Sequence, residues 1–235
     1  MEIISASWWM RYDGYSRKYY QRKGMRGVLV LMRHGESEWN AVGKWTGLTD
    51  IPLTEKGREE ARRAAVVIKD IHFERAFCSK LARATQTVEE ILTALGRQDI
   101  PVTYTNALNE RDYGIYTGKN KWEVKKEIGE EQFEAIRRGY ETPIPGGENL
   151  QQVCQRVHPY YTENILPLLV KGKHILVTAH NNSLRAMIKL VENIPDDKAA
   201  GIEMKTGEVL QYEIDETGKM VGKIKLVVNE EAGLQ

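Results

Sequence analysis

The sequence has few cysteines. Cys78 and Cys154 are the only 2 in 235 residues, and neither belongs to a metal-ligand spacing. The count is consistent with a reducing compartment. Cys78 follows Ala76 and Phe77 in a short apolar run, so we expect it to be a small buried core residue.

Long hydrophobic runs and an excess of charge of one sign are also lacking. No apolar stretch is long enough to cross a bilayer. The net charge is +1, so no overall field argues for nucleic acid or a membrane as a partner. The chain contains no repeat and no low-complexity segment. Its 235 residues, 41% hydrophobic and 29% charged, fit one α/β domain better than two.

The most informative stretch is an apolar run that ends in polar residues. Val28 to Met32 read as a strand buried on both faces, followed by Arg33, His34 and Gly35. A neutral imidazole is a nucleophile toward phosphorus, and a neighbouring guanidinium can bind two phosphate oxygens. Gly35 lets a carbonyl approach the ring, where it would select one tautomer. Taken alone, so short a triplet is explained better by a strand that ends in a solvated arginine and histidine.

A second strand repeats this pattern. His174 to Ala179 is apolar, and His180 and small polar residues that open a helix follow it. Ligands bind at the carboxyl ends of the strands in an open α/β sheet. We therefore expect the two histidines to meet in one crevice.

The other predicted elements alternate between strands and helices. Thr54 caps a helix that buries Ala61, Ala64, Ala65 and Ile68, and Arg83 begins the helix after a strand at 75–78. A strand is expected at 101–104, with Glu110 in the loop beyond it. Further helices are expected at 121–140, from 150 onward with a kink or break at Pro159 and Pro167, and at 183–192. A hairpin of strands 209–214 and 223–228 should lie at or near a sheet edge. This order predicts a three-layer α/β/α sandwich with a mostly parallel central sheet.

Residues 1–26 differ from the rest because they mix aromatic and basic residues. We interpret them as an amino-terminal extension, either an arm or an organelle-targeting segment, and residues 27–235 as the catalytic domain.

Taken together, the motifs resemble the histidine phosphatase superfamily, and within it the cofactor-dependent phosphoglycerate mutases. The resemblance covers about residues 27–228. It is carried by Leu31 to Asn40, Thr46-Gly47, Arg83, Leu108 to Gly114, Lys121, Arg137-Arg138 and His180 to Ala186.

The resemblance implies a role for each matching position. His34 would be the phosphorylated nucleophile, and Glu110 the general acid and base. Arg33, Arg83 and His180 would form the phosphate pocket. The substrate-binding positions would be Ser37, Asn40, Thr46, Gly47, Tyr113, Lys121, Arg137, Arg138, Asn181 and Asn182.

The implied reaction interconverts 3-phosphoglycerate and 2-phosphoglycerate in glycolysis and gluconeogenesis. It needs 2,3-bisphosphoglycerate as primer and no metal. The implied partners are small phosphoglycerates, and neither nucleic acid nor a membrane is implied. The implied location of the protein is the cytoplasm, unless residues 1–26 direct import into an organelle. The oligomeric state is not implied, and a homodimer is one alternative. The alternatives are a phosphatase of the same superfamily and a non-catalytic phosphate-binding adaptor.

Two departures from the family pattern suggest hypotheses. Asn181 stands where the family has glycine, and we expect its side chain to crowd a backbone amide that faces phosphate and so to reduce activity. The segment from Glu141 to Leu150 is shorter than in longer family members, so more water should reach the phosphohistidine and hydrolyse it.

Overall fold

The structure is a computed structural model that describes residues 26–226 and residue 228. The predictions for residues 1–26 therefore lie, apart from Arg26, outside the described residues. Within them, no helix is long and apolar enough to span a bilayer.

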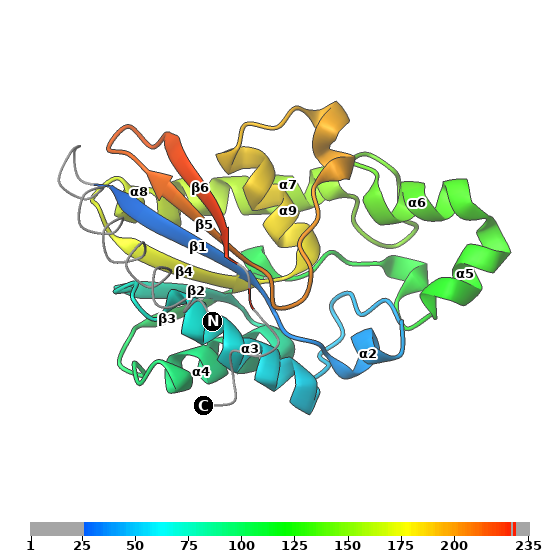
Figure 1. Ribbon diagram of the computed structural model, residues 1–235. Helices are drawn as coiled ribbons and strands as arrows, with labels where there is room; N and C mark the ends of the chain where they lie inside the picture. Colours follow the sequence, from blue (N-terminus) through cyan, green and yellow to red (C-terminus); the bar gives the residue numbers. More distant parts are fainter. Residues whose placement is uncertain (1–25, 227, 229–235) are drawn as a thin grey trace, which may run out of the picture.

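Six strands form one sheet in the order β3-β2-β4-β1-β5-β6 (Figure 1). The strands are β1 Gly27–Arg33, β2 Arg75–Ser79, β3 Val102–Thr105, β4 His174–Ala179, β5 Val209–Ile214 and β6 Met220–Leu226. The pairs β1/β4, β2/β4 and β2/β3 are parallel, whereas β5 runs antiparallel to β1 and β6 antiparallel to β5. The mostly parallel sheet and the hairpin at its edge are confirmed. The last strand begins at Met220, three residues earlier than predicted.

Helices cover both faces of the sheet, so the three-layer prediction is confirmed. The α-helices are α2 Glu38–Ala41, α3 Glu55–Ile68, α4 Ala82–Ala94, α5 Lys121–Ile128, α6 Glu130–Arg138, α7 Leu150–Tyr160, α8 Leu166–Leu169 and α9 Asn181–Val191. Short 3₁₀ turns lie at η1 Asn106–Leu108, η2 Gly114–Tyr116 and η4 Asp196–Gly201, and η3 Tyr161–Ile165 is a π-helical turn. One buried cluster joins the sheet to α3 and α4, and another joins it to α7, η3, α8 and α9.

The sequence patterns explain where the early elements begin. The Thr54 side chain accepts a hydrogen bond from the Gly57 N–H and caps α3, as predicted. Val28 to Met32 of β1 are buried on both faces of the sheet. Cys78 is fully buried in β2, as predicted. The helix that contains Pro159 ends at Tyr160 and gives way to the π-helical turn, so the predicted break is confirmed.

Two helix predictions were wrong in detail. The helix predicted for 121–140 is two helices, α5 and α6, because Gly129 adopts a φ of 81° that a continuing helix does not allow. Both pack beyond the carboxyl ends of the parallel strands (Figure 1), where Trp45, Tyr113, Val124, Phe133 and Ile136 belong to a third apolar cluster. Helix α9 begins at Asn181, two residues earlier than predicted. Ser183 lies in its first turn and accepts a hydrogen bond from the His180 N–H.

Candidate active site

Two histidines lie against each other at the carboxyl ends of the parallel strands. His34 follows β1 and His180 follows β4, and the strand register pairs Arg33 with Ala179, one residue before each histidine. The ring centroids are 4.9 Å apart, and both side chains are buried. The parallel register therefore brings together two imidazoles that are far apart in the chain.

The His34 ring is held in one tautomer. Its Nδ1 lies 2.7 Å from the Gly35 carbonyl oxygen, which can only accept, so Nδ1 carries the proton. The lone pair is therefore on Nε2, the atom that can attack phosphorus. Gly35 is needed here because a Cβ at this position would lie 2.1 Å from the Gly57 carbonyl oxygen of α3. A methyl group would push the helix away from the end of β1.

The surroundings of His34 favour its neutral form. Burial lowers its pKa well below the usual 6.5, the positive charges of Arg83 and Arg33 lower it further, and the hydrogen bond to Gly35 only partly opposes them. The imidazole is therefore uncharged at neutral pH, as a nucleophile must be.

His180 is oriented by Ser79, a residue that the sequence analysis missed. The Ser79 hydroxyl donates to Asn109 Oδ1 at 2.9 Å, so it accepts from His180 Nε2 at 2.7 Å. The Nδ1 atom of His180 is buried without a partner. Ser79 is the last residue of β2 and thus lies at the same edge of the sheet, which was a usable signal.

Glu110 faces the same site, and its carboxylate is anchored through one oxygen. Oε1 accepts hydrogen bonds from the Arg111 N–H at 2.8 Å, the Asn182 N–H at 3.2 Å and Asn182 Nδ2 at 3.1 Å. Oε2 is then the oxygen left to exchange a proton. Because Glu110 is only 6% exposed, bulk water competes little for this atom.

Arg156 of α7 clamps the loop that carries Glu110. Its Nη1 donates to the carbonyls of Ala107 and Asn109, and its Nη2 to the Glu110 carbonyl, over 2.8 to 3.1 Å. Glu148 accepts from the same guanidinium at 3.0 Å. The sequence analysis missed this clamp, because Arg156 lies on a helix face that shows no local signal.

Most of the predicted site residues line a single hollow between these elements. Its volume is about 80 Å³, which is smaller than most small-molecule sites. It is lined by Arg33, His34, Asn40, Lys44, Trp45, Thr46, Gly47, Arg83, Glu110, Tyr113, Lys121, Arg137, Asn181 and Glu203. The sequence analysis missed Lys44, Trp45 and Glu203 among them. The lining includes the basic side chains of Arg33, Lys44, Arg83, Lys121 and Arg137, which suit a ligand with more than one anionic group.

Four predicted site residues are not part of this lining. His180 lies directly behind His34. The Ser37 hydroxyl and N–H both donate to Asn40 Oδ1, which leaves the Asn40 amide N–H groups to face a ligand. Asn182 lies behind the lining and donates to Glu110 and to the Tyr113 hydroxyl. Arg138 is paired with Glu203 at 2.9 Å.

Backbone carbonyls hold two of the arginines in place. Arg83 donates to the carbonyls of Thr49 at 3.0 Å and Gly47 at 2.8 Å. Arg33 donates through Nη1 to the Met204 carbonyl at 2.7 Å. The Arg33 Nε atom is buried and has no partner. These fixed guanidiniums need little reorganisation to bind a phosphate.

Asn181 has a partner that changes the expectation from sequence alone. Its Oδ1 accepts from the Met204 N–H at 3.2 Å, and Met204 in turn accepts from Arg33. We therefore expect Asn181→Gly to loosen Arg33 and to lower kcat/KM about five-fold, the equivalent of about 1 kcal/mol for one net hydrogen bond. Steady-state kinetics with 3-phosphoglycerate would test this. A rise in activity would favour the crowding hypothesis instead.

Lys121 should lose its charge under mildly alkaline conditions. Burial and the charges of Arg33 and Arg137 lower its pKa to about 8, and Glu110 only partly opposes this. The amine is charged below that pH and neutral above it. We expect the KM for 3-phosphoglycerate to rise about ten-fold from pH 7 to 9, with kcat almost level. Lys121→Arg, which stays charged, should flatten this rise; identical profiles would contradict the assignment.

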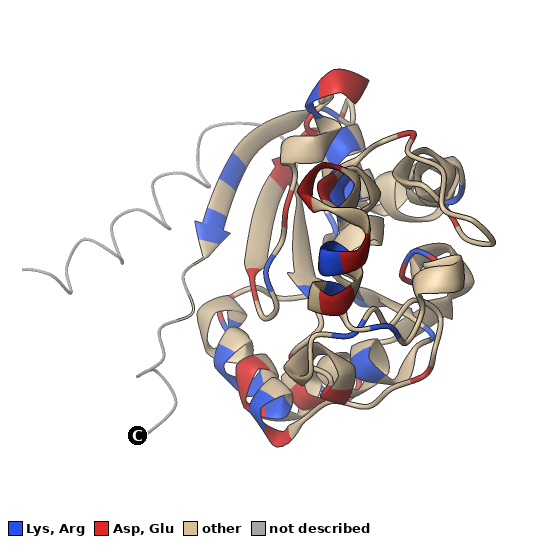
Figure 2. Cartoon of the chain, turned by 90° about the vertical axis from the view of Figure 1, so that its right-hand side faces the viewer, with Lys and Arg blue, Asp and Glu red and all other residues tan. Residues whose placement is uncertain are grey.

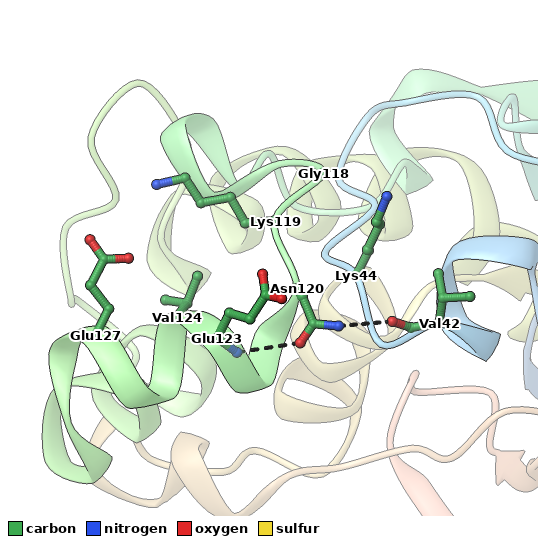
Figure 3. Close-up of a pocket in the computed structure, with 8 residues that line it drawn as sticks. All are labelled: Val42, Lys44, Gly118, Lys119, Asn120, Glu123, Val124 and Glu127. Atoms are coloured by element: carbon green, nitrogen blue, oxygen red, sulfur yellow. Dashed lines mark hydrogen bonds between the residues drawn. The ribbon is translucent and has the colours of Figure 1, made fainter.

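Lys44 also lines a second hollow (Figure 3). Asn120 bridges its two walls by donating to the Val42 carbonyl and accepting from the first turn of α5. Its lining mixes Lys44 and Lys119 with Glu123 and Glu127, so it does not concentrate charge of one sign. Basic and acidic segments also alternate along the part of the chain that the structure describes (Figure 2). Within the residues described, no group of three or more His, Cys, Asp or Glu could hold a metal ion.

Comparison with known proteins identifies many relatives. A family model described as histidine phosphatase superfamily (branch 1) matches residues 29–226. A protein named 2,3-bisphosphoglycerate-dependent phosphoglycerate mutase from Parvibaculum lavamentivorans is 42% identical over 208 residues, covering 88% of this chain and 99% of that protein. One of the same name from Cytophaga hutchinsonii is 45% identical over 186 residues, covering 79% of this chain and 87% of that protein.

The solved structures that match include phosphatases. The α-ribazole phosphatase from Shigella flexneri superposes with a TM-score of 0.70 at 26% identity, over 88% of this chain and 98% of that one. The family model covers the sheet, both histidine strands and the hollow between them. The chain therefore belongs to the histidine phosphatase superfamily, branch 1.

Proposed function

We propose that this chain is a phosphoglycerate mutase that interconverts 3-phosphoglycerate and 2-phosphoglycerate through a phosphohistidine on His34, in glycolysis and gluconeogenesis. The observation that carries the proposal is the His34 tautomer, which leaves Nε2 free beside two arginines and a buried carboxylate. The names of relatives 42% and 45% identical to this chain support the mutase over other activities of the superfamily.

The residues present fit 2,3-bisphosphoglycerate as the primer. Arg33 Nε, Thr46 Oγ1 and His180 Nδ1 are buried polar atoms without a partner, and acceptor oxygens would satisfy the donors among them. Arg33 and Arg83 would hold the phosphate next to His34, and His180 would join them once its Nδ1 carries a proton. Lys121, Arg137 and Arg138 would hold the second anionic group. When bound, the bisphosphate supplies the phosphoryl group that first loads His34.

The chain's own groups account for the transfer. Glu110 accepts the proton of the substrate 2-hydroxyl through Oε2 while that oxygen attacks phosphorus, and the bond from phosphorus to His34 Nε2 breaks. After the ligand has turned, Nε2 attacks the phosphorus at position 3. Glu110 then returns the proton to the departing oxygen at position 3. The arginines stabilise the charge on the transferring oxygens at both stages.

A phosphatase of the same superfamily is the second candidate, because the matching solved structures include a phosphatase. In a phosphatase, water takes the phosphoryl group from His34. Segment 141–150 bears on this choice: the Ile115 N–H donates to the Pro145 carbonyl and the Glu148 N–H to the Asp112 carbonyl, so the segment packs beside Tyr113. How far it excludes water from His34 decides the balance of the two activities.

One assay separates the candidates. Purified protein is given 3-phosphoglycerate with and without 2,3-bisphosphoglycerate, in the presence of a chelator, and 2-phosphoglycerate is counted against released phosphate. Primer-dependent isomerisation well above phosphate release is the expected result. Dominant phosphate release would make the protein a phosphatase, and the absence of both products would favour the phosphate-binding adaptor.

The remaining assignments belong to the same proposal. Residues 27–235 would form the catalytic domain, and residues 1–26 an arm or a targeting segment. A cytoplasmic location would fit these substrates, and a targeting role of residues 1–26 would instead direct the protein into an organelle. Light scattering on the full chain would decide between a monomer and a homodimer.

A further inference from the structure

An acidic side chain lies at the substrate-facing edge of the arginine pair. Glu203, in the segment between η4 and β5, lines the same hollow as His34 and Glu110. Its Oε2 is 2.9 Å from Arg138 Nη2, and its Oε1 is 3.7 Å from Arg137 Nη2. Both arginines that would hold the second anionic group of a ligand therefore already have a carboxylate partner.

A second carboxylate contacts the same two arginines from outside the hollow. Glu134 lies one turn earlier on α6, 3.5 Å from Arg137 Nη1 and 3.7 Å from Arg138 Nε. Unlike Glu203, it is not among the residues that line the hollow. Glu203 and Glu134 therefore pair with the same two arginines, but only Glu203 is placed to contact a ligand in the hollow.

The electrostatics agree with this placement. Partial burial raises the pKa of Glu203, but the hydrogen bond from Arg138 and the charges of Arg138, Arg137 and Arg33 outweigh burial and leave the pKa below its usual value. Glu203 is therefore ionised at neutral pH. An anion that binds to the arginines must therefore either displace the Glu203 carboxylate or bind beside it against its electrostatic repulsion.

We propose that Glu203 sets how tightly the second anionic group of the substrate is held, by occupying Arg137 and Arg138 until a substrate carboxylate or phosphate exchanges with it. The proposal rests on the proposed function, in which a doubly anionic ligand must turn round within the site. A pair of unopposed arginines would bind one end of that ligand firmly. An internal carboxylate that can return to the arginines makes release of that end easier.

The proposal predicts a difference between two kinds of phosphate ester. Glu203→Gln should lower the KM for 3-phosphoglycerate and the Kd of the unprimed enzyme for it about five-fold, the upper range for a partly exposed ion pair. It should lower kcat as well, because the ligand turns more slowly. For p-nitrophenyl phosphate, which has no second anionic group, kcat/KM should change less than about two-fold.

The experiment compares Glu203→Gln with Glu134→Gln. Each is titrated calorimetrically with 3-phosphoglycerate in the absence of primer, then assayed with both esters. Tighter binding only in the Glu203 variant is expected. Equal affinity, weaker binding, or the same gain in both variants would overturn the proposal. If Glu203→Gln does not fold, Glu203→Asp, with a shorter reach to the arginines, should show the same direction of change. If the wild-type protein shows no isomerisation, the proposed function is rejected. The titration would still test whether Glu203 competes with the ligand for Arg137 and Arg138.

Discussion

Replacing His34 with glutamine is expected to lower isomerisation by at least about 10⁴-fold, because it removes the proposed covalent carrier of the phosphoryl group. Its Nδ1 is bound to the Gly35 carbonyl, and its Nε2 faces the hollow. The neighbouring imidazole of His180 is not expected to substitute, because it packs against the His34 ring and does not line the hollow. Glutamine fills a similar volume, so the fold should persist.

Two measurements would check this result. Acid-labile phosphate on the protein after incubation with 2,3-bisphosphoglycerate should disappear together with turnover. The matched control is His174→Gln, which alters a histidine at the opposite end of β4 and should retain both signals. Residual phosphorylation of the His34 variant would mean that another residue carries the phosphoryl group.

Replacing Glu110 with glutamine is expected to lower isomerisation about 10³-fold, within the range for loss of a general acid and base. The amide oxygen can keep the three hydrogen bonds that Oε1 accepts, so the site geometry should hold. The amide nitrogen that replaces Oε2 cannot accept the hydroxyl proton. The loss is therefore chemical rather than structural.

A substrate whose leaving group needs no proton provides the control for the role of Glu110 in proton transfer. A p-nitrophenolate needs no proton as it leaves, so transfer from p-nitrophenyl phosphate to His34 should fall less than about ten-fold in the variant. Single-turnover phosphorylation with this ester, set beside isomerisation of 3-phosphoglycerate, separates the two cases. Equal losses with both substrates would indicate that Glu110 supports the site geometry and does not move the proton.

A mutase and a phosphatase differ in the group that accepts the phosphoryl group from phosphohistidine, which is the hydroxyl of a phosphoglycerate in the first and water in the second. The hollow is lined by several cations, which favour a ligand with two anionic groups over water. Glu203 reduces this advantage because it competes for Arg137 and Arg138. The same side chain therefore affects both the turning of the ligand and the loss of phosphate to water.

Much of the fold follows from patterns between near neighbours in the chain. The apolar runs before His34 and His180 predict buried parallel strands, and such strands end at one edge of the sheet. Thr54 predicts the start of α3, and Pro159 predicts the break after α7. These features are local because a strand or a cap depends on residues only a few positions apart.

Only the tertiary structure decided how remote segments complete the site. Arg156 clamps the Glu110 loop from α7, Ser79 orients His180 from β2, and Glu203 opposes the arginines of α6. Arg156 and Glu203 show no pattern in their own neighbourhood, and the strand that ends at Ser79 does not reveal its partner, because each contact is made by closing a long loop. The strands that present the two histidines were thus determined by the sequence itself. The tautomers, the anchored carboxylate and the competing charge were determined by packing, which places donors and acceptors from distant elements within hydrogen-bonding distance.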